Sequence, residues 1–274
     1  MPQARRFDWK NLWLRIVSAT VLAPAALVIA WTDEGAGRPF LVLVSVAVAL
    51  LSIEWGLMIA PRAAARVAAL VMAAILAVVF LAYGGRIALA ACAVIAGAFL
   101  AALLSRGLTS RRMDAALGVL YIAPACLAIV WLRATLQGRG WTVMLLTVTW
   151  AADIAAYVVG NTLKGPRLWP RYSPNKTWSG FFGGLIGAAI AAVAVAHFLM
   201  RLSLAGAALI GLAGGMATMM GDLWESMLKR RFGVKDSGDL IPGHGGLLDR
   251  VDGLMFATMA FAAARLIVRF GWAH

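Results

Sequence analysis

Nine stretches of about 20 mostly apolar residues divide this sequence and limit what it can fold into. Each is long enough to cross the hydrocarbon core of a bilayer as a helix. Non-helical spans are excluded because unpaired backbone groups are too costly in hydrocarbon. The sequence therefore predicts an all-α integral membrane protein, a polytopic bundle of about nine transmembrane helices. The predicted spans lie near residues 12–31, 40–59, 65–83, 86–104, 115–134, 141–160, 181–200, 206–228 and 251–271.

The composition agrees with lipid as the main solvent of the chain. Hydrophobic residues make up 62% of the sequence, charged residues only 14%, and the mean hydropathy is +0.85. A net charge of +13 could indicate nucleic acid, but the Lys and Arg residues form short clusters between apolar runs. We therefore expect no nucleic-acid partner. Cys92 and Cys126 both fall within apolar runs, which argues against a disulfide framework and a thiolate metal site.

The distribution of Lys and Arg predicts the orientation. The N-terminal segment and alternate loops hold 17 of them, and the opposite loops hold five. The positive-inside rule then places the N-terminus and the two longest loops in the cytoplasm and the C-terminus outside. Arg5, Arg6 and Lys10 precede the first run, which we interpret as a retained span and not as a signal peptide. The expected location is a bacterial inner membrane, crossed several times.

No soluble domain is expected, and we divide the chain by the placement of its polar residues. Residues 1–140, with spans one to five, are predicted to be a scaffold, and residues 141–274, with spans six to nine and two basic loops, a catalytic region. Glycines are frequent in spans seven and eight, which indicates close contact of these two helices. They are Gly183, Gly184, Gly187, Gly211, Gly214 and Gly215.

Carboxylates at the edge of the membrane are the first candidates for a site. Seven of the twelve Asp and Glu residues follow residue 150, and four of them lie in or beside apolar spans. An ionised carboxylate there is expensive unless it is paired, hydrated or bound to a cation. The four residues are Asp153, Asp222, Asp249 and Asp252.

Three of these acids are expected at one depth. Asp222 precedes Lys229 by seven residues, about 10 Å along a helix, and Asp249 and Asp252 share one face at the start of span nine. Oxygen ligands suit Mg²⁺ or Mn²⁺, so Asp222, Asp249 and Asp252 are predicted to bind such an ion, with a second ion left open. Structural ion pairs, Asp249 with Arg250 and Asp222 with Lys229, are the alternative.

Further residues are interpreted from their positions in or beside the spans. On span eight, Glu225 and Ser226 share the face of Asp222. Glu54, on span two, is interpreted as a lone acid paired with a loop cation, outside the site. Ser173 is expected to cap span seven, with Pro174 as its first helical residue.

Two loops carry candidates for phosphate binding. The loop after span eight has four cations and then the turn Gly243–Gly246, whose backbone N–H groups and following helix N-terminus suit an anion. The loop 164–177 ends in Lys176 and Thr177, which are not needed as caps and are therefore candidates for phosphate contact. His244 has no second His or Cys beside it, which argues against zinc.

These residues together carry a family resemblance. Residues 226–252, SMLKRRFGVKDSGDLIPGHGGLLDRVD, resemble without a gap the signature of the phosphatidate cytidylyltransferase (CDP-diacylglycerol synthase) family. Asp153 with Tyr157, the block 173–177 and the segment 221–226 resemble further motifs of that family in the same order. The resemblance covers about residues 150–255, and the family often has Lys where this chain has Asn175.

The resemblance implies a metal-dependent transfer of CMP from CTP to phosphatidic acid, with release of pyrophosphate. It implies catalytic roles for Asp222, Asp249, Asp252, Lys229 and Arg250, and the three aspartates would bind the metal. CTP, phosphatidic acid and membrane lipid are the implied partners, and the oligomeric state is left open, with a homodimer as one alternative. The implied substrate-binding residues are Asp153, Tyr157, Ser173, Asn175, Lys176, Thr177, Ser226, Arg230, Lys235, Asp236, His244, Gly245 and Gly246.

Two other functions remain as alternatives. A CTP-dependent polyprenol or phytol kinase would share acids and basic loops, but it should lack the continuous segment from His244 to Asp252. A secondary transporter would have its charges near the midplane of two matching halves. This chain instead gathers them in its last part and on one side.

Overall fold

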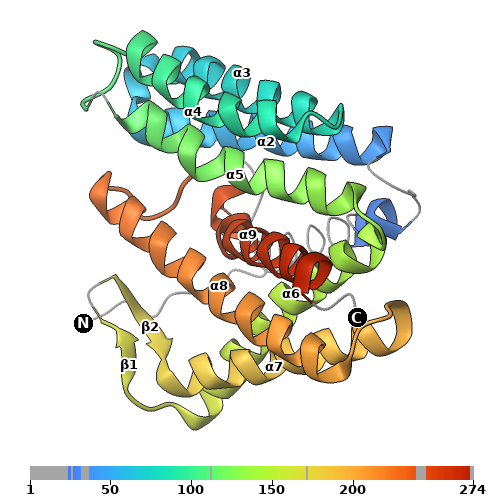
Figure 1. Cartoon of the computed structure of the whole chain (residues 1–274). Helices are drawn as coiled ribbons and strands as arrows, with labels where there is room; N and C mark the ends of the chain where they lie inside the picture. The colour runs from blue at the N-terminus through green and yellow to red at the C-terminus, as the bar shows by residue number, and fades with distance from the viewer. Residues whose placement is uncertain are drawn as a thin grey trace, which may run out of the picture.

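The computed structural model describes residues 24–25, 27–31, 37–111, 113–170, 172–238 and 245–271. This described part consists of long helices and one small antiparallel hairpin (Figure 1). Its elements are α2 (Arg38–Ile59), the 3₁₀ turn η1 (Pro61–Ala63), α3 (Ala64–Tyr83), α4 (Ile87–Leu104), α5 (Asp114–Ala134), α6 (Gly138–Leu163), β1 (Arg167–Trp169), β2 (Ser173–Thr177), α7 (Trp178–Leu199), α8 (Leu204–Arg231) and α9 (Leu248–Gly271).

The helices confirm the predicted fold class. Within the described residues, eight helices are long and apolar enough to cross a membrane. Their ends agree with eight of the predicted runs to within three residues. The reason is that an apolar run of this length lies in hydrocarbon, where the backbone N–H and C=O groups must be paired within a helix. The remaining run, 12–31, lies mostly outside the described residues. The chain is therefore an all-α, multi-pass membrane protein.

The segment before α7 differs from the prediction. Ser173–Thr177 forms strand β2, which pairs with β1 so that Trp169 faces Ser173 and Arg167 faces Thr177. Ser173 is therefore not the cap of α7, and Pro174 is not in its first turn. The cap is Thr177, whose Oγ1 accepts a hydrogen bond of 3.1 Å from the N–H of Gly180. The expectation that Thr177 is not needed as a cap is therefore wrong.

Small residues bring α6, α7 and α8 close together. A Cβ atom at Gly187 of α7 would lie 2.6 Å from Cβ of Ala155 on α6, and one at Gly211 of α8 would lie 2.6 Å from the carbonyl oxygen of Ala188 on α7. The expected contact of spans seven and eight is thus confirmed. The glycines of α7, however, also face α6.

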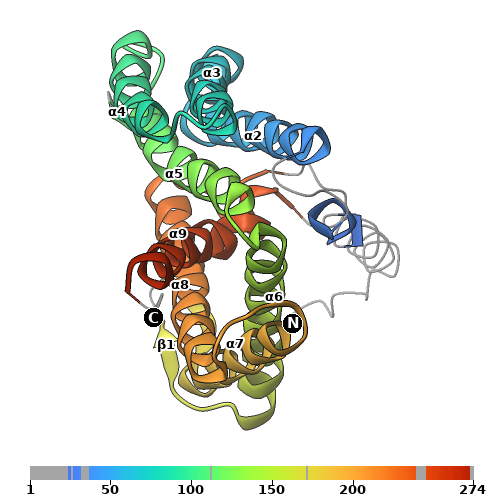
Figure 2. The same ribbon diagram turned by 45° about the vertical axis from the view of Figure 1, so that its right-hand side comes forward.

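Helix α9 lies between two groups of helices (Figures 1 and 2). One hydrophobic core is formed mainly by α2, α3, α4 and α5, and the other mainly by α6, α7, α8 and α9. Leu248 and Met255 of α9 belong to the first core, whereas Ala257 and Phe261 belong to the second. The helix also contacts α5, α6 and α8, so it connects the two parts of the chain. The division at residue 140 stays a prediction.

We expect Gly211→Val to destabilise the bundle. The added side chain must displace the backbone of α7, and overpacking of this kind costs about 1–3 kcal/mol. Ala213→Val is a matched control because Ala213 lies on the same helix with an exposed side chain. Thermal unfolding of both variants in detergent measures the effect. Equal unfolding midpoints for the two would show that the α7–α8 contact is not tight.

Candidate functional site

A cavity of about 790 Å³ lies between the two groups of helices and has two chemically different ends. One end is apolar and is formed by residues such as Phe40, Leu51, Ile129 and Trp150 of α2, α5 and α6. The other end is lined by charged and polar side chains. These are Asp153, Lys176, Asp222, Glu225, Ser226, Lys229, Asp249, Arg250 and Asp252. Such a space suits a ligand with a charged head and an apolar tail.

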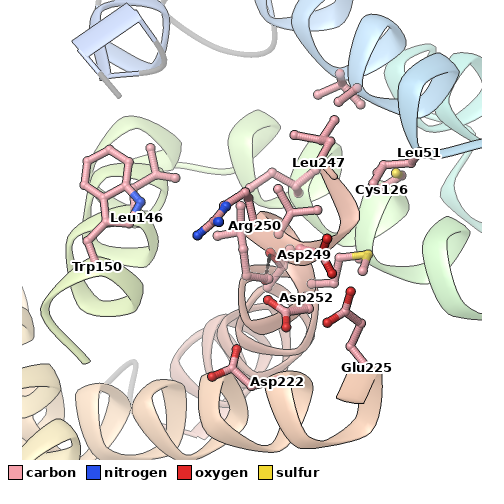
Figure 3. Close-up of a pocket in the computed structure, with 18 of the residues that line it drawn as sticks. Leu51, Cys126, Leu146, Trp150, Asp222, Glu225, Leu247, Asp249, Arg250 and Asp252 are labelled. Atoms are coloured by element: carbon pink, nitrogen blue, oxygen red, sulfur yellow. Dashed lines mark hydrogen bonds between the residues drawn. The ribbon is translucent and has the colours of Figure 1, made fainter. Parts of the chain in front are cut away.

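Close approach of α8 and α9 brings the carboxylates together. A Cβ atom at Gly221 of α8 would lie 2.9 Å from Cα of Gly253 on α9, and one at Gly253 would lie 3.1 Å from Oδ1 of Asp222. Only glycine permits this spacing of the two backbones. Figure 3 shows the result: Asp222 and Glu225 project from α8 into the same space as the side chains on the first turns of α9.

Lysine side chains compensate part of this negative charge. Nζ of Lys229 lies 2.7 Å from Oε2 of Glu225 and 2.5 Å from Oδ1 of Asp249, and the side chain is only 14% exposed. Lys176 of β2 forms an ion pair with Asp222. The alternative pair of Asp222 with Lys229 is therefore wrong. Lys229 and Glu225 are both on α8, but the pair of Lys229 with Asp249 joins α8 to α9 and the pair of Lys176 with Asp222 joins the hairpin to α8.

Asp249 organises the turn before α9. Its Oδ2 accepts hydrogen bonds from the backbone N–H of Ser237 at 3.1 Å, from Oγ of Ser237 at 3.0 Å and from the N–H of Gly246 at 3.1 Å. With Lys229 on Oδ1, both carboxylate oxygens are occupied by protein donors. Gly245 has a φ of 80°, which favours glycine and lets the turn close around this carboxylate.

The interpretation of Glu54 as the partner of a loop cation is wrong. Its carboxylate, which is fully buried, accepts hydrogen bonds from the backbone N–H groups of Leu247 and Leu248 at 2.6 and 2.7 Å. The unpaired N–H groups at the start of a helix attract an anion, and here a carboxylate of α2 supplies it. Of the N–H groups that the sequence suggested for a substrate anion, those of Gly246, Leu247 and Leu248 are therefore bonded to protein carboxylates.

Some of the other predicted site residues line the cavity and others do not. Asp153, Lys176, Ser226 and Arg250 line the cavity with the residues above, whereas Tyr157 is 74% exposed and lies outside its lining. His244 is outside the described residues. Also absent from the cavity lining are Ser173, Asn175, Thr177, Arg230, Lys235 and Asp236. Their proposed contacts with substrate stay predictions.

Three residues that contact the site or its supporting residues were not predicted to be part of it. Glu225 shares a helical face with Asp222 and Lys229, and this spacing was the signal that it belongs to the cluster. Glu54 is an acid within an apolar run, which is itself a signal of function. For Ser237, which joins Glu54 to Asp249, the signal was its place within the signature segment 226–252.

The residues at the charged end fit a divalent cation that is shared with substrate phosphates. No three Asp, Glu, His or Cys side chains of the described residues are placed to hold a metal ion by themselves. However, Mg²⁺ is commonly held by one or two carboxylates together with substrate phosphates. Oε1 of Glu225 is buried and has no hydrogen-bond partner, and Asp222 and Asp252 line the same space. Oxygen ligands of this kind suit a hard cation.

Comparison with known proteins agrees with this geometry. The model of a family described as the cytidylyltransferase family matches residues 13–268. The chain belongs to the cytidylyltransferase family. The match therefore includes all eight described spans except the last residues of α9.

Three proteins that are similar to this chain are each named phosphatidate cytidylyltransferase. The phosphatidate cytidylyltransferase of Brucella suis is 38% identical over 271 residues, which cover 95% of this chain and 93% of that protein. The phosphatidate cytidylyltransferase of Pseudomonas aeruginosa is 38% identical over 162 residues, 57% of this chain and 58% of that protein. That of Staphylococcus saprophyticus is 40% identical over 146 residues, 53% of this chain and 56% of that protein. The likeness to the Brucella protein extends through both groups of helices.

We expect Lys229→Met to destabilise the protein strongly. The substitution leaves the carboxylates of Glu225 and Asp249 without their shared cation, and breaking a buried ion pair costs about 3–5 kcal/mol. Arg230→Met is the matched control, because Arg230 is the next residue of α8 and its side chain is exposed. Thermal unfolding in detergent should separate the two variants clearly. A Lys229→Met protein as stable as the control would mean that the ion pairs contribute nothing to stability.

Proposed function

We propose that this chain is a phosphatidate cytidylyltransferase, which transfers CMP from CTP to phosphatidic acid and forms CDP-diacylglycerol and pyrophosphate. The observation that carries the proposal is the cavity with a charged end and an apolar end in a member of the cytidylyltransferase family. Phosphatidic acid has this same division between a phosphate head and acyl tails. The likeness to relatives of that name over most of their length supports the same substrates.

The reaction needs no nucleophilic side chain. An oxygen of the phosphate monoester attacks the α-phosphorus of CTP, a P–O bond forms, and the bond from that phosphorus to the bridging oxygen of pyrophosphate breaks. The leaving pyrophosphate takes the electron pair, so the protein has to align two anions and stabilise the charge that develops. Lys176 and Arg250 line the cavity and are the proposed phosphate contacts, while Lys229 holds Glu225 and Asp249 in place.

We further propose a requirement for Mg²⁺ or Mn²⁺. Among the described residues, the cavity is lined by five carboxyl groups and only three basic side chains, yet both substrates are anions. Bound metal would neutralise charge on the triphosphate and on the leaving pyrophosphate. Asp222 and Asp252, with Glu225, are the proposed ligands. We assign Asp249 to positioning, because its oxygens are already occupied by four protein donors.

The proposed location is the inner membrane, with the charged end of the cavity on the cytoplasmic side. The excess of Lys and Arg in the loops at that end supports this orientation. It also suits the substrates, because CTP arrives from water while the acyl tails remain in lipid.

Labelled CTP tests the reaction. With purified protein, phosphatidic acid and Mg²⁺, we expect label from the α-phosphate of CTP to enter the lipid and label from the γ-phosphate to appear in pyrophosphate. The reason is that attack at the α-phosphorus releases the outer two phosphates together. Transfer of the γ-label to lipid would instead indicate a CTP-dependent kinase, and no transfer of either label would contradict the proposal.

Metal dependence has a separate test. EDTA should abolish turnover, and added Mg²⁺ or Mn²⁺ should restore it. Asp222→Asn and Asp252→Asn should raise the Mg²⁺ concentration needed for half-maximal activity or lower turnover by about 100-fold, because each removes a proposed ligand. Asp114→Asn serves as the control, since Asp114 is buried and ion-paired with Arg231 outside the cavity. Full activity in excess EDTA would disprove the metal requirement.

A further inference from the structure

We propose that Glu54, in the amino-terminal group of helices, is a positioning residue for the site on α8 and α9. The inference deepens the proposed function, on which its kinetic test rests. Glu54 lies on α2, and its hydrogen-bond partner Leu248 follows 194 residues later in the sequence. The carboxylate does not line the cavity, so it can act on substrate only through the residues that it holds.

The contacts of Glu54 fix the start of α9. Its Oε1 accepts from the N–H of Leu247 and its Oε2 from the N–H of Leu248, the first residue of the helix. A carboxylate at a helix N-terminus satisfies free N–H groups and interacts favourably with the helix dipole. The next residues of the same turn are Asp249 and Arg250, followed by Asp252, and all three line the cavity. An anchored first turn therefore sets the position of these three side chains.

The surrounding backbone leaves space for this carboxylate. A Cβ atom at Gly246 would lie 2.9 Å from Oε2 of Glu54 and would also collide with Oγ of Ser237. A Cβ atom at Gly238 would lie 3.3 Å from Cγ of Glu54. Two glycines of the loop thus border the Glu54 side chain. This gives Gly246 a packing role that is independent of phosphate binding.

A continuous set of polar contacts leads from Glu54 to the charged end of the cavity. Oγ of Ser237 lies 3.3 Å from Oε2 of Glu54 and 3.0 Å from Oδ2 of Asp249. Asp249 in turn pairs with Lys229, which also pairs with Glu225 of α8. The contacts therefore connect α2, the loop after α8, α9 and α8. Loss of Glu54 should displace the carboxylates of the site without removing any of them.

A role in stability alone is the competing explanation, and Asp114 provides the matched control. Like Glu54, Asp114 is a buried acid of the amino-terminal group, and its carboxylate pairs with Arg231 of α8. Among the described residues, its carboxylate bonds to Arg231 and not to the first turn of α9 or to Ser237. Asp114→Asn should therefore lower stability without changing the geometry of the site.

The test compares Glu54→Gln, Glu54→Asp and Asp114→Asn in the full-length protein. Glutamine removes the charge and leaves one N–H without an acceptor, whereas aspartate keeps the charge but is one methylene shorter. Hydrogen exchange followed by mass spectrometry reports on the peptide covering residues 245–252. In Glu54→Gln we expect its exchange to become about tenfold faster, as for the loss of a helix cap. We expect no change in Asp114→Asn.

Kinetics give the second readout. Glu54→Gln should lower kcat by about 10-fold to 100-fold, because a displacement of about 1 Å at a reacting centre costs that much, while the KM for CTP changes little. Glu54→Asp should recover part of the lost turnover, and Asp114→Asn should keep wild-type kcat. If Glu54→Gln does not fold, the same two measurements on Glu54→Asp decide the question.

Two results would overturn the proposal: unchanged exchange of residues 245–252 in the Glu54 variants, or faster exchange with wild-type kcat. A wild-type protein that transfers no CMP would refute the proposed function instead. The exchange measurement needs no activity, so in that case it still decides whether Glu54 holds the first turn of α9.

Discussion

The structure depends on how a membrane-embedded bundle accommodates carboxylates. An ionised acid within such a bundle is costly unless a cation or hydrogen-bond donors compensate it. In this chain Lys229 forms ion pairs with Glu225 and Asp249, and Lys176 forms one with Asp222. Backbone N–H groups donate hydrogen bonds to Glu54. The compensating groups come from other helices or from the hairpin in most of these contacts. The same interactions that make the acids tolerable therefore fix the relative positions of α2, α8, α9 and β2.

This arrangement also explains why the charged groups lie beside an apolar cavity. Helix α9 passes between the two hydrophobic cores: Glu54 and Lys229 contact its start, while its later residues, such as Ala257 and Phe261, belong to the second core. The cavity is bounded by both groups of helices and takes its apolar wall from α2, α5 and α6. A lipid substrate requires contact with both environments at once. The proposed reaction thus places its phosphate chemistry at the boundary between them.

The sequence predicted the features that depend on residues within one helix, namely its boundaries and the residues on one face. Predictions were wrong for features that depend on contacts between segments distant in the sequence. The helix boundaries follow from the length of the apolar runs, and the common face of Asp222, Glu225 and Lys229 follows from helical spacing. Ser173 has the residue type of a helix cap, but the pairing of β2 with β1 makes that segment extended, and Thr177 caps α7 instead. Glu54 was assigned to a cation because no sequence pattern shows that the start of α9 lies against α2.

The role of Glu54 also changes how the amino-terminal helices are understood. The family resemblance was limited to residues after about 150, which suggested a scaffold that only surrounds the site. Yet α2 supplies part of the apolar wall of the cavity. It also supplies the carboxylate of Glu54, which accepts hydrogen bonds from the N–H groups of Leu247 and Leu248 at the start of α9. A helix N-terminus close to lipid needs an acceptor for those groups, and the preceding glycine-rich turn has no side chain that could provide one at Gly245 or Gly246. For Leu247 and Leu248 the acceptor is Glu54 of α2, so the amino-terminal helices contribute directly to the start of α9 and not only to the surroundings of the site.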